Sequence, residues 1–325
     1  MQNENGRRQT AFSAESLLVA LLFLLPAAVP PFFAWLNCLL AVPVFVLLQI
    51  SEDERRAARQ MLNCLLAAAV VALLLGRPGL FLFSAAMLPL GWSLHRSARR
   101  GASPAAAGGA GLAVLSLSWL TFWLLYGLAA GVNPYSSLLH QLDSSFARLT
   151  EAYRASAEIP AEMLHDMELI AAELRNVLLP KVLPGLLAGT AVFTVWLNMI
   201  AGSKMLRRLR AERAVWHPYR NWRLPDILIW LLIAAAALSL LGGGLAQAGY
   251  TLGIAAGLLY FFQGAAVFAS LLHRWNIPAF WRAVLYFFVA VQGYGVLLLT
   301  AAGVADTWAD FRRLAQDGRP DADPS

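Results

Sequence analysis

The stretch Lys204–Arg223, KMLRRLRAERAVWHPYRNWR, is the most informative part of the sequence for the fold, because it holds seven of the 25 lysine and arginine residues. Long apolar runs flank it, Val182–Ser203 before it and Leu224–Leu241 after it. Short loops rich in lysine and arginine stay on the cytoplasmic side of a membrane. The stretch therefore predicts a cytoplasmic loop between two membrane-spanning helices.

The composition of the whole chain agrees with this interpretation. Of the 325 residues, 59% are hydrophobic and only 14% are charged, against about 25% charged in soluble domains. The net charge of +6 does not indicate nucleic-acid binding, because the basic residues lie in short loops beside apolar runs and no nucleic-acid-reading motif accompanies them. We expect membrane lipid to be the partner of these charges, and no nucleic acid.

The apolar runs predict an all-α fold, a polytopic bundle of about nine membrane spans, since each span needs roughly 20 apolar residues. Two pairs of short helices are expected first. Ser16–Ile50 carries prolines in its middle, and Met61–Leu75 and Leu80–His95 flank a Gly-Arg-Pro-Gly turn, so whether all four short segments span stays open. The five longer runs are Gly109–Val132, Val182–Ser203, Leu224–Leu241, Tyr250–Leu272 and Ala283–Val304.

The distribution of basic residues predicts the orientation. With the N-terminus inside, 17 basic residues fall on the cytoplasmic side and eight outside, which satisfies the positive-inside rule. We expect a multi-pass protein of the bacterial cytoplasmic (inner) membrane with a cytoplasmic N-terminus. The expected domains are an N-terminal membrane bundle (1–132), an extracytoplasmic helical hairpin (133–180), a C-terminal membrane bundle (181–304) and a polar tail (305–325).

The expected hairpin rests on two apolar stripes with helical spacing. Its first arm carries Leu142, Phe146 and Leu149, and the break between the arms falls at Ile159-Pro160. Such stripes pack locally against the bundle or pair with a second protein, and the sequence leaves both alternatives open.

Small residues at four-residue spacing predict close helix contacts. These are Gly249, Gly253 and Gly257 in one span, with Gly264 further along it, and Gly185 and Gly189 in another. The contacts are expected within the chain, and a homodimer is the alternative.

The sequence carries no phosphate-binding loop, zinc helix or nucleophile elbow. Its histidines are scattered singly, so no metal site, catalytic residue or cofactor is predicted, and the chain is not expected to be an enzyme. Amides within the spans, Asn37, Asn63, Asn198, Gln263 and Gln292, bridge helices or bind a neutral solute. No charged pair is expected at mid-membrane, which argues against ion coupling.

A solute site, if present, is expected at the outer ends of the first six spans. The candidate residues there are Trp35, Asn37, Arg77, Trp123, Tyr126 and Asn133. Arg77 is the only cation among them and could bind an anionic solute. The alternative is an arginine that only extends its charged group to water at the membrane interface.

Three stretches give the chain a family likeness: Asn221–Asp226, Leu259–Gly264 and Gly303–Arg312, the last being the most specific. On these it resembles the YybS-like family of bacterial polytopic membrane proteins of unknown function. That family is distantly similar to the substrate-binding membrane subunits of energy-coupling-factor transporters, which implies an ATPase and other membrane subunits supplied by separate chains. This sequence has about three more spans than those subunits, and it lacks their Ala-x-x-x-Ala docking spacing in the first helix.

The sequence is compatible with two alternative functions. The first is a substrate-binding or accessory component of small-molecule transport. The alternative is a non-transporting membrane scaffold in envelope assembly or division, which recruits partners through the hairpin or the basic loop.

Overall fold

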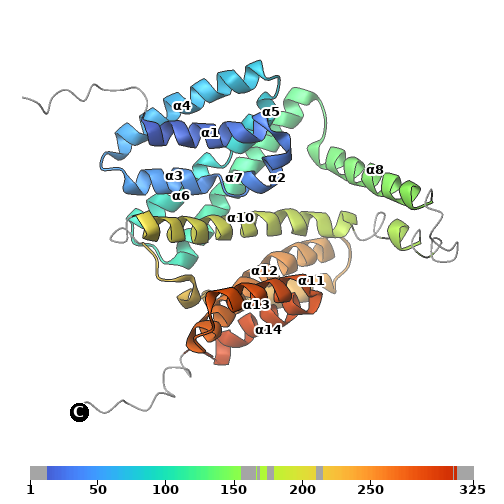
Figure 1. The fold of residues 1–325 in the computed structure, drawn as a ribbon. Coiled ribbons are helices and arrows are strands. Elements are labelled where there is room, and N and C mark those ends of the chain that lie inside the picture. The colour runs from blue at the N-terminus through green and yellow to red at the C-terminus, as the bar shows by residue number, and fades with distance from the viewer. Residues whose placement is uncertain are drawn as a thin grey trace, which may run out of the picture. The chain divides into compact units, whose positions relative to one another are not determined.

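The computed structural model describes residues 13–154, 166, 169–173, 179–209, 215–309 and 311–312. Every regular element in these ranges is a helix (Figure 1), as the sequence predicts. Most of the second arm of the expected hairpin, the middle of the basic loop and the end of the polar tail lie outside the described residues.

The chain divides into two compact units. The first unit is Met1–Phe122 with Ala191–Arg223, and the second unit is Trp123–Thr190 with Leu224–Ser325. Each unit therefore draws on separate stretches of sequence. This spatial grouping differs from the linear division expected from composition, which stays a prediction.

The first unit begins with a helix broken at prolines. Its elements are α1 (Ala14–Ala28), η1 (Pro30–Phe32), α2 (Phe33–Asn37), α3 (Ala41–Ile50), α4 (Glu54–Leu74), α5 (Pro78–Ala85), α6 (Leu88–Arg99), most of α7 (Pro104–Ala130) and the later part of α10 (Leu179–Leu209). The break after α1 falls at Pro30-Pro31, because proline cannot continue the hydrogen-bonding pattern of a helix. The break between α4 and α5 falls at Gly76, whose φ of 69° suits glycine.

Large apolar side chains fill the first unit. Phe23, Phe45 and Leu90 have no exposed surface. The pairs α1 with α4 and α3 with α6 pack together (Figure 1). Gly91 permits the second contact, since a Cβ there would lie 2.6 Å from the side chain of Val44.

The described end of the basic loop folds back onto the first unit. Trp216 is 5% exposed and stacks on Phe45 at a centroid distance of 5.7 Å. Its Nε1 donates to the carbonyl of Ala102 at 3.0 Å, and Arg207 donates to the carbonyl of Trp216 at 2.7 Å. The described end of this loop is thus a packed part of the unit.

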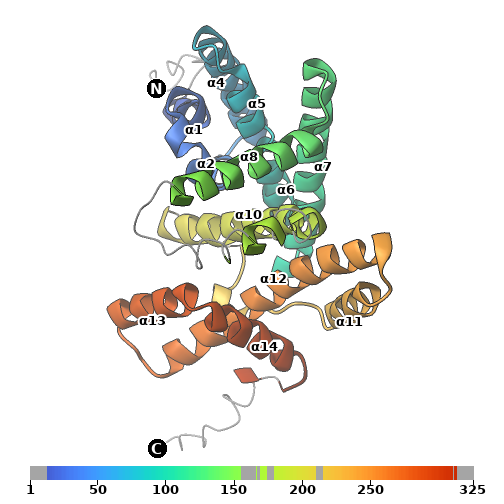
Figure 2. The ribbon, with the colours of Figure 1, turned by 90° about the vertical axis from the view of Figure 1, so that its right-hand side faces the viewer.

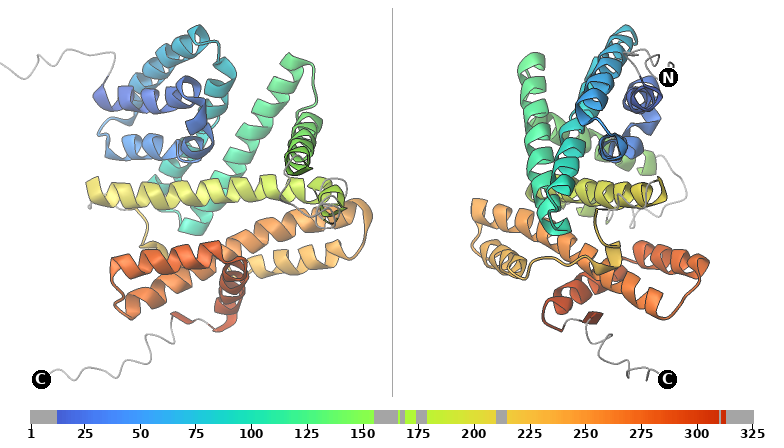
Figure 3. Two further views of the ribbon diagram at one scale, coloured as in Figure 1. Left: turned by 45° about the vertical axis from the view of Figure 1, so that its right-hand side comes forward. Right: turned by 90° about the vertical axis from the view of Figure 1, so that its left-hand side faces the viewer.

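The second unit is arranged around one long helix, α12 (Gly243–Arg274). The other elements are the end of α7, α8 (Pro134–Arg154), the start of α10, α11 (Leu228–Ser239), α13 (Ala279–Val291) and α14 (Gly293–Ala309). Figures 2 and 3 show α11 running along the first part of α12, and α14 against its middle. Gly242 and Gly243 turn the chain between α11 and α12 with φ values of 79° and 57°.

Within the described part of the chain, four helices are long and apolar enough to cross a membrane: α4, α7, α10 and α12. A fifth crossing results if α13 and α14, which meet at a bend of 101°, form one broken span. The sequence predicts a single continuous run over Ala283–Val304, whereas the helix breaks at Gln292. Three further apolar helices are shorter, so nine crossings stay a prediction.

α8 is the helix expected for the first arm of the hairpin. None of its residues is buried, and Leu149 is 52% exposed. The hairpin as a whole stays a prediction, because most of its second arm lies outside the described residues.

Candidate functional site

A buried amide joins two separate parts of the first unit. Asn198 lies on α10 and has no exposed surface. Its Nδ2 donates to the carbonyl of Cys38 at 2.6 Å and to the carbonyl of Thr194 at 2.7 Å. Cys38 lies in the turn between α2 and α3, so its carbonyl is at a break in the helix. The amide therefore bridges helices, which is one of the two roles that its sequence position allowed.

Three buried polar atoms, on Asn198 itself, on Thr194 and on the chain neighbour of Cys38, lack a protein partner. Among the described residues, Asn37 Oδ1, Asn198 Oδ1 and Thr194 Oγ1 are buried without a hydrogen bond. Thr194 has no exposed surface, and Asn37, next to Cys38 in the chain, is 6% exposed. We call Asn37, Thr194, Asn198 and the Cys38 carbonyl the amide centre. Buried polar atoms in proteins are almost always hydrogen-bonded, so unpaired acceptors indicate a missing partner.

Of the predicted solute residues in the first unit, only Asn37 belongs to the amide centre. Trp35 is 83% exposed. Arg77 donates from Nη1 to the carbonyls of Ala27 and Ala28, at 3.2 and 3.4 Å. Those carbonyls end α1, so Arg77 caps this helix, a position where a cation is favourable.

The remaining three predicted solute residues lie in the second unit. Trp123 and Tyr126 meet edge to face at 5.9 Å on α7. Asn133 accepts from the backbone N–H groups of Tyr135 and Ser136 at 3.0 and 3.3 Å, and so caps the start of α8. A site combining these residues with Asn37 stays a prediction.

Most of the predicted packing glycines contact a neighbouring helix of the same chain. A Cβ at Gly185 would lie 2.5 Å from Ile254, and one at Gly189 would lie 3.5 Å from the same side chain. At Gly249 it would meet the backbone of Ser239 on α11. Gly253 faces Ala235 at 3.8 Å, and Gly257 has open space around it among the described residues.

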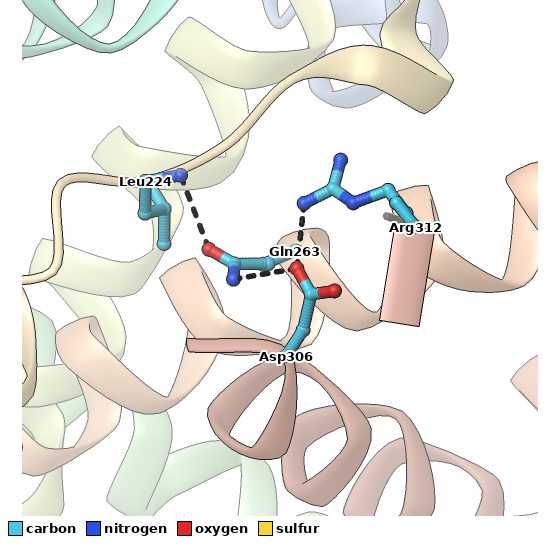
Figure 4. A network of polar contacts seen from close by, with 4 residues as sticks. All are labelled: Leu224, Gln263, Asp306 and Arg312. Atoms are coloured by element: carbon cyan, nitrogen blue, oxygen red, sulfur yellow. Dashed lines mark hydrogen bonds and ion pairs between the residues drawn. The ribbon is translucent and has the colours of Figure 1, made fainter. Parts of the chain in front are cut away.

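The second unit contains a buried polar network (Figure 4). Asp306 on α14 has no exposed surface, and its Oδ2 accepts from Gln263 Nε2 at 3.0 Å and from Arg312 Nη2 at 2.6 Å. Gln263 Oε1 in turn accepts from the backbone N–H of Leu224 at 3.1 Å. One amide side chain therefore connects the start of the α11 segment to the carboxylate at the end of α14.

A close helix crossing positions this network. A Cβ on Gly264 would collide with the carbonyl of Leu299, and a Cβ on Gly303 would collide with the carbonyl of Tyr260. The backbones of α12 and α14 are thus in direct contact, as small residues permit between membrane helices. Gln263 is adjacent to the crossing and Asp306 lies one turn beyond it.

Sequence reasoning missed the role of Asp306. It ended the last span at Val304 and gave Asp306 no role, whereas α14 continues to Ala309 and buries Asp306 against α12. The sequence feature that could have identified this network is the family likeness. The three stretches that carry the likeness contain all four residues of the network: Leu224, Gln263, Asp306 and Arg312.

The chain belongs to the family described as predicted membrane protein (DUF2232), whose model matches residues 17–307. The resemblance to a membrane-protein family of unknown function is thereby confirmed, and the protein is a helical membrane protein. No curated protein and no solved structure matches the chain.

Proposed function

We propose that this member of the DUF2232 family is a solute-binding component of small-molecule transport, and that the amide centre of the first unit is where the solute binds. The supporting observation is the set of unpaired buried acceptors on Asn37 and Asn198 beside the broken α2–α3 segment. Transporters commonly build their substrate sites at interrupted helices, where the backbone is freed from helical hydrogen bonds.

The chemistry of the centre defines the solute class. Two amide oxygens accept hydrogen bonds and the Thr194 hydroxyl both donates and accepts. No charged side chain belongs to the centre as defined. A small neutral molecule with N–H or O–H donors satisfies these atoms, and an anion does not.

We also propose a membrane topology and a separate chain that supplies ATP hydrolysis. We place the protein in the bacterial inner membrane with the N-terminus in the cytoplasm and about nine crossings, which the positive-inside distribution supports. Because the sequence carries no phosphate-binding loop, ATP hydrolysis would be supplied by a separate chain, as in the transporters that the family resembles.

Mass spectrometry of small molecules retained by the purified protein tests this function. A solute should be recovered from the natural protein, and adding it back should raise the melting temperature, because ligand binding stabilises the folded state. Asn37→Leu removes an unpaired acceptor and keeps the Asn198 bridge, so it should abolish retention.

Asn63→Leu is the matched control, because Asn63 lies exposed on α4, and it should leave retention unchanged. Finding no retained molecule in repeated preparations, or equal retention in both variants, would overturn the proposal.

The scaffold function has one observation in its favour, the exposed amphipathic surface of α8. Under that alternative, the purified chain should retain partner proteins instead of a solute. Replacing Leu142, Phe146 and Leu149 by serine should then release those proteins without lowering the melting temperature.

A further inference from the structure

The structure assigns a binding site for an anionic phospholipid headgroup to the end of the first unit at which α6 and α10 finish. From the sequence, lipid is expected only as a general partner of basic residues, whereas here one surface and one headgroup chemistry are specified. This site is separate from the amide centre, so either proposal can fail alone. We call the surface the basic end and define it by five exposed cations: Arg96, Arg99, Arg100, Lys204 and Arg208.

The basic end lies where two membrane spans finish. α10 is long and apolar enough to cross a membrane, and its last two turns carry Lys204 and Arg208. α7 is also long enough, and it begins at Pro104, four residues after Arg100. The hydrocarbon core ends where an apolar span ends. The cations therefore lie at the level of the lipid phosphates, whichever side of the membrane this end faces.

Contacts within the unit bring the ends of α6 and α10 together. Trp216 donates from Nε1 to the carbonyl of Ala102, just after α6, and Arg207 on α10 donates to the carbonyl of Trp216. A Cβ on Gly108 of α7 would lie 3.4 Å from the sulfur of Met199 on α10. The cations that end α6 and those that end α10 therefore belong to one end of the unit.

The five side chains lie on faces turned away from the core. α6 buries one face of its last turns and leaves the face with the three arginines exposed. On α10, Lys204 and Arg208 are four residues apart and share an exposed face, whereas Gly202 and Leu206 are buried. Long cationic side chains on such faces reach the phosphates of lipids beside the helices.

The described part of the chain gives these cations no acidic partner. None of the five side chains forms an ion pair there, and the sequence has no aspartate or glutamate between Glu54 and Asp143 or between Glu173 and Glu212. Glu54 lies beside α6, but it pairs with the buried His95 at 3.3 Å. An external phosphate supplies the missing negative charge, and arginine binds phosphate through two parallel N–H groups.

A second group of three arginines in the same unit has different surroundings. These residues lie in the first turns of α4, directly after the acids Glu52, Asp53 and Glu54, and are Arg55, Arg56 and Arg59. Because the neighbouring acids offset its charge, this group should not select anionic lipid. It provides a control with the same number of arginines.

Native mass spectrometry of the full-length protein in detergent, titrated with phosphatidylglycerol or phosphatidylcholine of identical acyl chains, tests the site. The natural protein should bind phosphatidylglycerol at least about tenfold more tightly, because the headgroup of phosphatidylcholine has no net charge. Arg96→Gln/Arg99→Gln/Arg100→Gln, the α6 variant, should lose this preference. Replacing the same three residues by lysine keeps the charge and should keep most of the preference.

Arg55→Gln/Arg56→Gln/Arg59→Gln, the α4 control, should retain the preference. Lys204→Gln/Arg208→Gln, the α10 variant, tests the site independently of α6 and should weaken phosphatidylglycerol binding at least about threefold. Glycerol phosphate at equal concentration should not displace the lipid, which distinguishes a lipid site from a site for soluble phosphate. Circular dichroism establishes that each variant is folded.

Four outcomes would each overturn the proposal. They are equal binding of the two lipids by the natural protein, equal losses in the α6 variant and the α4 control, unchanged binding in the folded α10 variant, and displacement of the lipid by glycerol phosphate.

Discussion

The first unit is held together by large side chains, whereas the second unit relies on backbone contact and a charged network. Phe23, Phe45 and Leu90 fill the first unit, and its polar bridge through Asn198 is neutral. In the second unit, Gly264 and Gly303 bring two helix backbones together beside a buried ion pair.

This difference determines where each unit is sensitive to substitution. An apolar core tolerates changes that conserve volume, so many combinations of apolar residues can fill the core of the first unit. A crossing without room for a Cβ tolerates no side chain at all, and a buried charge tolerates no loss of its partner. In the second unit, Gly264, Gly303 and Asp306 are therefore expected to be sensitive to substitution, as Gly91 is in the first unit.

The largest loss of stability is expected for Gly264→Val. The new side chain would collide with the carbonyl of Leu299, and separating α12 from α14 should cost more than about 3 kcal/mol. Thermal unfolding of the purified protein in detergent measures this. Gly257→Val makes the same change on the same helix where space is open, and it should cost less than about 1 kcal/mol. Equal effects at both positions would mean that the crossing does not hold the unit together.

The next largest loss of stability is expected when the charged network of Asp306 and Arg312 is broken. Arg312→Ala removes the cation that pairs with the buried carboxylate of Asp306, which should cost about 3–5 kcal/mol. The double variant Asp306→Asn/Arg312→Ala removes both charges and should be more stable than Arg312→Ala alone. Chemical unfolding of the natural protein, of the single variants Asp306→Asn and Arg312→Ala, and of the double variant gives the coupling between the two residues. Strictly additive losses would contradict an energetically coupled pair.

A smaller effect tests the packed loop of the first unit. Trp216→Phe keeps the ring against Phe45 but loses the Nε1 hydrogen bond to Ala102, so the free energy of unfolding should fall by about 1 kcal/mol. Trp275→Phe is a control, since Trp275 is 64% exposed, and it should change stability by less than about 0.5 kcal/mol. No difference between the two variants would mean that the loop is not held by Trp216.

The sequence predicts features of the fold that depend on local chemistry. Composition identifies a helical membrane protein, and the breaks at Pro30-Pro31 and at Gly76–Pro78 fall at residues that disfavour helix, although Pro26 and Pro184 lie inside α1 and α10. The break at Gln292 has no proline near it, but Gly293 and Gly295 follow it directly, and a Cβ on Gly295 would collide with the carbonyl of Val289. The hydrophobic run alone predicted a continuous span there, because hydropathy does not distinguish a glycine bend from a straight helix.

The site residues were harder to predict for the same reason. Spacing rules find small residues that repeat along one helix, whereas Gly264 and Gly303 form a pair only after two helices cross. Asp306 follows an apolar run and so resembles the first residue of a polar tail. The sequence marks Asn37 as a candidate because it is an amide within an apolar run, and its role in a solute site stays a prediction.

The smallest effect separates two roles for Arg77. If it serves as a cap for α1 through the carbonyls of Ala27 and Ala28, Arg77→Ala should lower the free energy of unfolding by about 0.3–1 kcal/mol. Arg77→Lys keeps the positive charge at the helix end and should recover part of that loss. The sequence-based alternative, an arginine that binds an anionic solute, predicts unchanged stability without solute in both variants. Unfolding measured in the absence of any added anion therefore distinguishes them, and equal stability of all three proteins would exclude the cap.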